Sequence, residues 1–447
     1  MKKLHIILLS AAALISLGAS AQSFRSGYFL DNYTYGYRIN PAQVNDRGFL
    51  GIGVGNIDLQ NNMNMGLGSF LFNKNGSIVT GLNHQVGVDE FLGGLNQNNY
   101  VSLDESINIL SLGIANGKRM HTFEVNVRVM DTESVPYDLF ALAKKGGTGT
   151  YNFGGLYADV SAMADIAYGY SMNINDNLSV GGRLHVLLGV VNVNLSTESS
   201  TVTLSDSRIS VNPNMTLMAS GLLNVEPSST SVIDFSKIGQ LNTKSPIGGF
   251  GASLDLGVQY KSDFGLEAMF SVTDLGMISW QNNFAANASA SFDYTGATIG
   301  FDGGSVTTDL ADILDVSKIL KWDSGKGTPG MAMMPFNIAA GARYFMPFYD
   351  KLSVGALATY HNAKCASWFD ARLGATITPA RIISLTGNIG YGSLGATWGT
   401  ALDLHLGPIN LLVGVDSFLG KYGTLAGIPV PLKGFPMNAH VGLCITF

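Results

Sequence analysis

The residues of this chain that could do chemistry are ionisable side chains that recur at alternate positions of long stretches of mixed polarity. Carboxylates stand near arginines and histidines in these stretches, so they either form a structural network of ion pairs or surround a functional site. We favour the structural network, because enclosed charges need partners wherever they lie. The candidate residues are Asp159, Asp165, Arg183, His185, Arg343, Asp370, Arg372, Asp403 and His405.

Linear motifs of the common catalytic and metal-binding families are missing from the sequence. It has no His-Glu-x-x-His, no Gly-x-Ser-x-Gly, no phosphate-binding loop and no cysteine pair at metal-ligand spacing. His361 and Cys365 are a candidate ligand pair. No further ligand stands near them, so we interpret them as loop residues. We predict no enzyme activity, no cofactor and no metal site.

The stretches that carry the ionisable residues have a period of two, most clearly over residues 156–195. From Leu156 to Met172 the even positions are apolar, and the odd positions include Asp159, Ser161 and Asp165. Turn-forming residues 173–177 follow, and the alternation then resumes. The pattern predicts an antiparallel hairpin with arms of roughly 17 residues, much longer than the usual 5 or 6. At about 3.3 Å per residue, each arm can cross a bilayer.

Similar runs recur to the end of the chain. They cover residues 48–58, 107–115, 120–131, 156–172, 178–196, 248–261, 264–280, 335–346, 351–361, 368–378, 381–392, 396–406, 409–419 and 438–447. Short connections alternate with longer ones, including 132–155, 197–247, 281–334 and 420–437. This layout is typical of barrels whose short turns are periplasmic. We predict an all-β fold: a transmembrane antiparallel β-barrel of about 14 strands (12 to 16) with long extracellular loops.

The alternation also predicts which face each residue occupies. We expect an outward aromatic girdle of Tyr168, Tyr170, Tyr260, Phe264, Tyr344, Tyr360, Trp368 or Phe369, Trp398 and Phe447. The inward face should carry the ionisable residues above, together with Glu124, Arg128, Asp255, Glu267 and Asp416.

Two details of the inward face depend on register. If Asn173 pairs with Asn177, Asp165 lies opposite His185 and diagonal to Arg183. Asp274 has outward parity, and we interpret it as a bulge or a rim position.

The two ends of the chain predict export and insertion. Lys2 and Lys3 precede an apolar run, and Ala19-Ser20-Ala21 is a small-x-small cleavage pattern, so residues 1–21 are expected to be a signal peptide. No cysteine follows, so a lipoprotein anchor is not indicated. The last amphipathic strand ends in Phe447, which resembles the signal read by the barrel-insertion machinery. We predict the outer membrane of a Gram-negative bacterium, with outer-membrane lipid around the barrel.

Composition agrees with a membrane barrel. Only 13% of residues are charged and the mean hydropathy is +0.22, which an outward apolar face would explain. A net charge of −6 and a pI near 5.6 argue against binding of nucleic acid. Cys365 and Cys444 fall at opposite ends of the predicted wall, too far apart for a disulfide, so we expect two free thiols.

Three regions do not alternate. Residues 22–47 are rich in tyrosine and form either a periplasmic tail or a plug, and the aromatic content favours burial in a plug. Residues 59–105 are either an external loop with a hairpin or two more wall strands. The loops 197–247 and 281–334 contain the similar sequences Asp234 to Ile238 and Asp315 to Ile319, which either form equivalent short helices or match by chance. Residues Pro136 to Lys145 are expected to form a short helix.

A family resemblance rests on Asn40-Pro41-Ala42 after the signal peptide, the stretch Ser271 to Gly276 with Trp280, and Phe447. With about 14 strands, these features resemble an uncharacterised Bacteroidetes family of outer-membrane barrels. That family is similar in build to the FadL-type long-chain fatty-acid transporters and to PorV, a barrel component of the type IX secretion system. The resemblance implies that residues 22–47 plug a barrel formed by residues 48–447. It does not imply fatty-acid transport, because no residues match a ligand pocket.

Three hypotheses follow. A plugged barrel that passes hydrophobic small molecules should show an apolar cavity beside residues 22–47 and a lateral gap or kinked strand. A surface barrel that holds a secreted protein should show ordered loops and no continuous cavity. An enzymatic barrel would need Ser, His and an acid within hydrogen-bond reach. We favour the first hypothesis on the resemblance.

Overall fold

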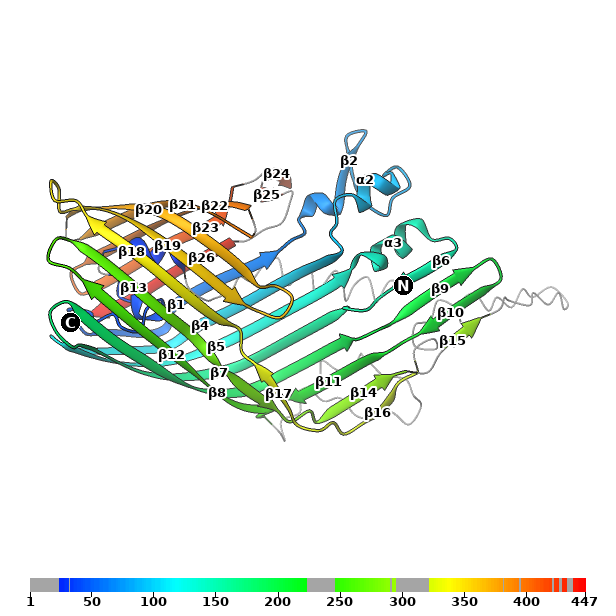
Figure 1. Ribbon diagram of the computed structural model, residues 1–447, viewed down its shortest axis with the longest axis horizontal. Helices are drawn as coiled ribbons and strands as arrows, with labels where there is room; N and C mark the ends of the chain where they lie inside the picture. Colours follow the sequence, from blue (N-terminus) through cyan, green and yellow to red (C-terminus); the bar gives the residue numbers. More distant parts are fainter. Residues whose placement is uncertain are drawn as a thin grey trace.

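The computed structural model describes residues 24–31, 33–222, 246–289, 292–294, 321–380, 382–393, 395–419, 422–425, 428–431 and 437–447. Its main body is a closed antiparallel β-barrel of 14 strands (Figure 1). The wall strands, in their order around the barrel, are β1 (Phe49–Met63), β4 (Asn98–Asn116), β5 (Arg119–Pro136), β7 (Tyr157–Asn173), β8 (Leu178–Thr197), β12 (Gly249–Lys261), β13 (Leu266–Trp280), β18 (Phe336–Phe345), β19 (Leu352–Asn362), β20 (Trp368–Ala380), β21 (Ile383–Gly392), β22 (Gly395–Leu406), β23 (Ile409–Phe418) and β26 (Met437–Thr446).

Closure comes from the pairing of the last strand with the first. β26 pairs with both β23 and β1, and Phe49 lies opposite Thr446. Every wall strand therefore has a hydrogen-bonded neighbour on both sides, which a bilayer requires because lipid offers no hydrogen bonds. Each predicted run coincides with one wall strand, so the predicted fold class is confirmed.

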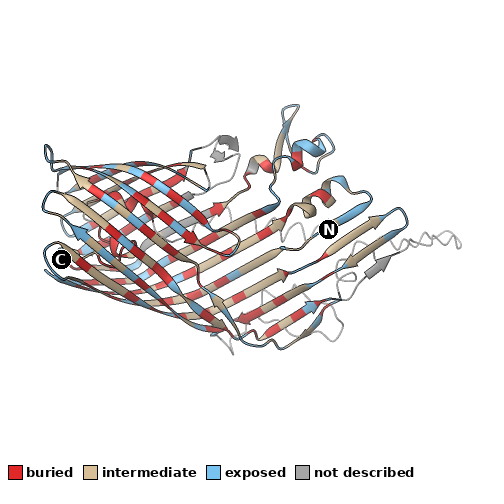
Figure 2. Cartoon of the chain, in the orientation of Figure 1, coloured by how far each residue is buried: buried red, intermediate tan, exposed pale blue. Residues whose placement is uncertain are grey.

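The two faces of the wall differ as the alternation predicts (Figure 2). Along β8, Arg183 and His185 are 6% and 3% exposed, whereas Leu184 and Val186 are 55% and 46% exposed. The exposed face is apolar, which suits lipid. Among the expected outward aromatics, Trp368 is buried and its neighbour Phe369 is exposed. No described helix is long and apolar enough to cross a membrane.

The rim that carries the long connections, called here the external rim, has further elements. Residues 64–97 form a small hairpin and helix and do not enter the wall. This decides the open question about residues 59–105, whose ends belong to β1 and β4. The elements of this rim are η3 (Leu67–Ser69), β2 (Leu71–Lys74), β3 (Ser77–Thr80), α2 (Val88–Leu92), α3 (Tyr137–Lys145), β6 (Gly149–Asn152), β9 (Thr201–Ser205), β10 (Arg208–Asn212), β11 (Met215–Gly221), β14 (Phe284–Ala288), β15 (Phe292–Tyr294), β16 (Asp323–Gly325), β17 (Gly330–Met333), β24 (Tyr422–Leu425) and β25 (Ile428–Pro431).

Several of these elements bear on predictions. The helix α3 confirms the helix expected over Pro136 to Lys145. The similar sequences Asp234 to Ile238 and Asp315 to Ile319 lie outside the described residues. On the outside of α2, the hydrogen bonds from Lys74 hold the pKa of Glu90 below its usual range. Both cysteines are free, as expected.

One bulge and one register difference decide the details expected of the inward face. On β13, Asp274 has φ +62° where the register with β12 shifts, and the bulge turns its carboxylate inward. The bulge interpretation of Asp274 is therefore correct. On β8 the pairing with β7 places Asp165 opposite Leu187, and His185 opposite Ala167. The expected Asn173–Asn177 register is wrong by two residues, a slip that leaves every side chain on its predicted face.

Candidate functional site

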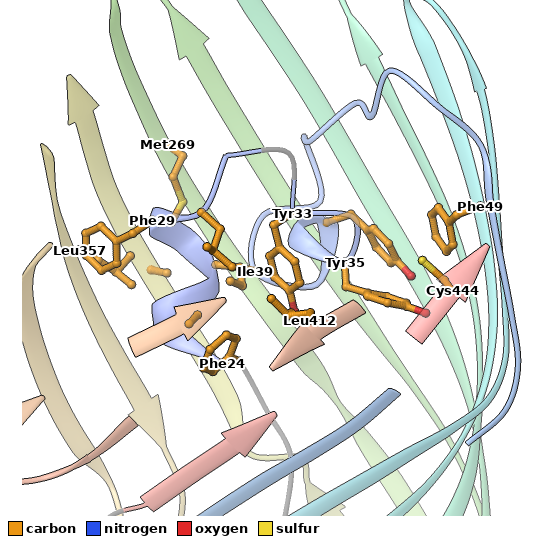
Figure 3. Close-up of a cluster of buried hydrophobic side chains, with 14 of the residues drawn as sticks. Phe24, Phe29, Tyr33, Tyr35, Ile39, Phe49, Met269, Leu357, Leu412 and Cys444 are labelled. Carbon is orange, nitrogen blue, oxygen red and sulfur yellow. The ribbon is translucent and has the colours of Figure 1, made fainter. Parts of the chain in front are cut away.

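The candidate functional site is the interface between the barrel wall and residues 24–45, called here the lumenal segment. Its chain is irregular, with two 3-10 turns, η1 (Arg25–Phe29) and η2 (Gly36–Arg38). Glycine and tyrosine in this stretch give no apolar periodicity, so single turns form instead of a helix or strand. Figure 3 shows Phe24, Phe29, Tyr33, Tyr35 and Ile39 of the segment packed together with wall side chains. We divide it into a first half (residues 24–31) and a second half (residues 33–45).

Glycines of the inner wall make room for the segment. A methyl group at any of them would collide with a segment residue, so alanine would not fit without displacement. This close approach of backbone to a packed chain is a role that only glycine fills. The glycines and the segment residues they face are Gly414 and Phe24, Gly399 and Ser26, Gly341 and Tyr28, Gly374 and Phe29, Gly51 and Tyr35, Gly257 and Asn40, and Gly181 and Pro41.

The tripeptide Asn40-Pro41-Ala42 lies on one such pair of glycines. Gly181 of β8 and Gly257 of β12 are direct partners in the sheet, and Pro41 and Asn40 contact them. The Asn40 side chain donates to the Val258 carbonyl at 3.3 Å and accepts from the Ala42 amide at 3.1 Å. Ala42 is fully buried. The motif is therefore a tight turn fixed against the wall by its own asparagine.

The first half of the segment enters a cluster of four charges. Arg25 lies 3.2 Å from Asp370, and its backbone amide donates to Asp416 at 3.0 Å. Arg372 binds the same two carboxylates at 2.5 and 2.6 Å. Burial and the nearby Arg372 lower the pKa of Arg25 to about 10, so the guanidinium stays charged at neutral pH. We call these residues the first ion cluster.

The second half enters a larger cluster centred on Glu124. This buried carboxylate accepts from the Tyr37 hydroxyl at 2.7 Å and from Arg38 at 2.6 Å, and it also pairs with Arg183. Burial raises the pKa of the Tyr37 phenol well above its usual value, so it remains a donor. We call the set the second ion cluster, which comprises Arg38, Asp104, Glu124, Arg128, Asp165, Arg183, His185, Asp255 and Asp274.

Within this cluster, His185 bridges two carboxylates. One ring nitrogen lies 2.9 Å from Asp165 and the other lies 3.1 Å from Asp255. Arg183 lies 3.0 Å from Asp255, and the expected position of Asp165, opposite His185 and diagonal to Arg183, is wrong. The two-residue difference in register places Asp165 diagonal to His185, still within reach of its ring. Arg183 instead lies beside Asp255 and Glu124.

The remaining predicted residues fall into separate groups. Arg343 pairs with Asp31 of the segment and donates to the Leu30 carbonyl at 2.9 Å. His405 lies 2.9 Å from Asp403, whose neighbour Asn410 hydrogen bonds with Thr34 of the segment. Asp159 instead accepts from its uncharged neighbours Tyr157 and Asn192, at 2.9 and 2.7 Å. The charges therefore form several clusters around the segment and not one network.

The wall of each cluster carries more carboxylates than cations. In the first, Asp370 and Asp416 face Arg372, and Arg25 of the segment restores neutrality. In the second, Arg38 of the segment adds a cation to a wall whose carboxylates outnumber its bases even when His185 is charged. Buried charges need this compensation. The segment and the wall are thus electrostatically complementary.

Sequence reasoning missed the residues that the segment itself contributes. Arg25, Asp31 and Arg38 stand in a stretch without periodicity, so no parity argument selects them. The contacts of the inward glycines were not predicted either. Glycines at inward positions of the wall, in a chain with an aromatic segment before the first strand, are a pattern that could have indicated them.

A cavity between the segment and the second ion cluster is small, and most of the residues that line it are polar or charged. Its volume is about 50 Å³, room for roughly three or four water molecules. Its lining includes Tyr33, Ile39, Ser106, Asn126 and Thr273 together with side chains of the second ion cluster. This cavity is not the apolar one expected for passage of hydrophobic molecules, because the charged side chains that hold the segment line it.

Comparison with solved structures finds barrels with low identity. The toluene transporter TodX of Pseudomonas putida is 10% identical, with 91% of this chain and 92% of that chain covered and a TM-score of 0.43. A FadL homologue of Pseudomonas aeruginosa is 12% identical, with 96% and 98% covered and a TM-score of 0.41. The translocator domain of the autotransporter NalP of Neisseria meningitidis is 8% identical, with 90% and 88% covered and a TM-score of 0.35.

Likenesses at this level carry no argument about ligand or mechanism. Among proteins with curated descriptions, none matches the chain significantly. A family model matches residues 41–416, which begin inside the lumenal segment and span all wall strands except the last. By this match, the chain belongs to the family of unknown function DUF5723.

Proposed function

We propose that this chain is an outer-membrane barrel that lets small hydrophobic molecules pass sideways through its wall, while the lumenal segment plugs the axial route. On this proposal, residues 1–21 are a signal peptide, residues 22–47 are the plug, and the ion clusters brace the plug without taking part in chemistry. Phe447 acts as the signal for the insertion machinery. The plug closes the axis because the segment fills the lumen with buried aromatic and paired charged side chains.

The observation that carries the proposal is a break in β1. Its pairing with β26 is interrupted between Leu50 and Asn56, and its pairing with β4 is interrupted between Ile52 and Asn56. Gly53 at the centre has φ +81°, and Ile52 is 72% exposed. The other register shifts of the described wall involve one extra residue each, whereas β1 has three extra residues against β26 and two against β4. The wall would therefore lose the fewest ladder hydrogen bonds by parting at β1.

Aromatic residues lie directly behind the break. A methyl group on Gly51 would come within 2.9 Å of the Tyr35 hydroxyl, and Tyr35 packs with Tyr37 and Phe49 at ring-centroid distances of 6.2 and 5.5 Å. A hydrophobic molecule passing the break from lipid would meet these rings before any charge. At the break, a hydrophobic molecule would have apolar contacts with lipid outside the wall and with these rings inside it. On this proposal, the break is the point of entry.

The test is to repair β1. Three residues of β1, Gly53 to Gly55, stand opposite Ile109 alone, so two of them are extra. Deleting Gly53 and Val54 removes both and preserves the side-chain parity of the strand. Uptake of a fluorescent long-chain fatty acid, and of a monoaromatic hydrocarbon, should fall several-fold in cells that express the repaired barrel. The matched control deletes Asn75 and Gly76 from the external hairpin and should leave uptake unchanged. Unchanged uptake in a folded, repaired barrel would remove the proposal.

The packing of the external rim supports a second candidate function, the docking of a secreted protein in the manner of PorV. Residues 64–97 pack with α3 and β6 around a core of Val86, Phe91, Leu92 and Ala141. Ile78 and Leu82 remain exposed above it, at 58% and 51%. An ordered loop with exposed apolar residues suits a protein partner. Replacing both with serine should abolish co-purification of a partner from the cell surface and leave hydrophobic uptake intact.

A further inference from the structure

The connection between β19 and β20, residues 363–367, folds into the barrel and contacts both side walls. We call it the crossing loop. The Asn62 side chain of β1 donates to the Ala366 carbonyl at 3.1 Å, and the Lys364 ammonium lies 3.7 Å from the centroid of the Tyr157 ring of β7. β8, β12, β13 and β18 separate the loop from β7, and β21, β22, β23 and β26 separate it from β1. The loop therefore reaches across the external end of the lumen.

The crossing loop is a rigid unit. The Ala363 amide donates to the Ser367 hydroxyl at 3.0 Å, and that hydroxyl donates back to the Ala363 carbonyl at 2.5 Å. Ala363 and Ala366 are 5% and 1% exposed. A loop closed on itself in this way moves as one piece with the strand ends at its base.

At its base the loop rests on the lumenal segment. Trp368 follows the loop directly, and the Arg25 guanidinium lies 4.7 Å from the centroid of its ring. On β19, His361 stacks on Trp368 with centroids 5.4 Å apart and is held by Asn337 at 2.8 Å. Arg25 also pairs with Asp370, two residues beyond Trp368. The first half of the segment thus contacts the β20 side of the loop's base, and the stacked His361 links this contact to the β19 side.

We propose that the crossing loop is a second closure of the lumen, and that the lumenal segment holds it shut through the contact of Arg25 with Trp368. Displacing the first half of the segment from the periplasmic side then releases the loop on the external side. Besides the hydrogen bond from Asn62, the closure has a contact of Lys364 with Tyr157 at its tip and a contact of Arg25 with Trp368 at its base, and these two can be removed one at a time. It concerns the axial route, so it does not depend on passage of hydrophobic molecules through β1.

The native thiol of Cys365, at the centre of the loop, reports directly on its position. It is half-buried, and burial raises the pKa of the thiol, so the closed loop should react slowly. A released loop exposes the thiol and returns its pKa toward the ordinary value. Both changes accelerate labelling.

The experiment labels the full-length barrel in intact cells with a membrane-impermeant maleimide, in a Cys444→Ala background. Tyr157→Leu, which removes the tip contact and keeps the Lys364 charge beside the thiol, and Arg25→Gln should each raise the labelling rate of Cys365 by roughly fivefold, the change expected for loss of one cation–π contact. Trp368→Leu should raise it as much without removing any charge. Lys74→Gln, which removes an external cation far from the loop in sequence and paired with Glu90, should leave the rate unchanged.

The variants separate the possible failures. If Tyr157→Leu labels at the wild-type rate, the tip contact does not hold the loop and the closure is refuted. If Tyr157→Leu labels faster but Arg25→Gln and Trp368→Leu do not, in folded barrels, the coupling to the segment is refuted. The β1 deletion should leave Cys365 labelling unchanged. Uptake therefore tests passage through β1, and labelling tests the closure, so one proposal can fail without the other.

Discussion

The two halves of the lumenal segment are held in different ways. The first half meets a compact cluster in which two arginines share two carboxylates, so each charge has a second partner. In the second half, the Tyr37 hydroxyl and the Arg38 guanidinium both bind one wall carboxylate, Glu124, which also pairs with Arg183. Loss of one carboxylate leaves both arginines of the first cluster with the other carboxylate, whereas loss of Glu124 removes a partner from Tyr37, Arg38 and Arg183 at once.

This difference suits two tasks. The first half supports the crossing loop through Arg25, so it has to move if that closure is to open, and a cluster with alternative partners lets it shift at modest cost. The second half lies on the paired glycines Gly181 and Gly257 and is the fixed end of the segment. The comparison predicts that the same kind of substitution has unequal effects in the two halves.

The largest effect is expected from removing the hub. Glu124→Gln leaves two buried guanidiniums without the carboxylate they share and should lower the free energy of unfolding by about 3–5 kcal/mol. Asp370→Asn in the first ion cluster should cost about 1–3 kcal/mol, because Arg25 and Arg372 keep Asp416. Denaturant unfolding in detergent micelles, followed by the heat-dependent gel mobility of barrels, measures both. Equal losses of unfolding free energy in Glu124→Gln and Asp370→Asn would show that the two halves of the segment are held in the same way.

A smaller effect is expected from filling the glycine surface. Gly257→Ala and Gly181→Ala place a methyl group against Asn40 and Pro41 and should cost about 1–3 kcal/mol through displacement of the segment. Gly387→Ala is the matched control, because no atom lies within 4 Å of its added carbon. The same unfolding assay applies. If Gly257→Ala were as stable as Gly387→Ala, the turn of Asn40-Pro41-Ala42 would not rest on the wall as described.

The smallest effect is expected from single hydrogen bonds to the segment backbone. Ser271 donates to the Ile39 carbonyl at 2.7 Å in the second half, and Thr376 donates to the Phe29 carbonyl at 2.6 Å in the first. Ser271→Ala and Thr376→Val should each cost about 1 kcal/mol. Thr376→Val should also speed Cys365 labelling, whereas Ser271→Ala should not. The reverse order would exchange the roles of the two halves.

The fold could be predicted because a barrel wall has a local rule. Alternation with period two is visible in each run, and lipid on one side makes the apolar face unambiguous, so even Asp274 was correctly suspected of a bulge. Register was harder. The pairing of Asp165 with Leu187 depends on how residues 173–178 turn, and turn chemistry there did not fix the loop length.

The site could be predicted only in part. The wall residues Arg183, His185, Arg343 and Arg372 were identified as inward because parity places them there. Their partners Arg25, Asp31 and Arg38 lie in a segment whose conformation is set by the wall and not by its own sequence. The crossing loop was likewise invisible, since nothing local to residues 363–367 indicates a contact with Tyr157 on another strand.

Burial of the segment inside the barrel is the central claim, and trypsin tests it directly on the folded protein. Arg25 and Arg38 are enclosed, and Arg47, just beyond the segment, is exposed. Mass spectrometry should therefore find cleavage after Arg47 in the native barrel and none after Arg25 or Arg38 until the barrel is heat-unfolded. Rapid cleavage after Arg25 and Arg38 in a barrel that still migrates as folded would contradict the account.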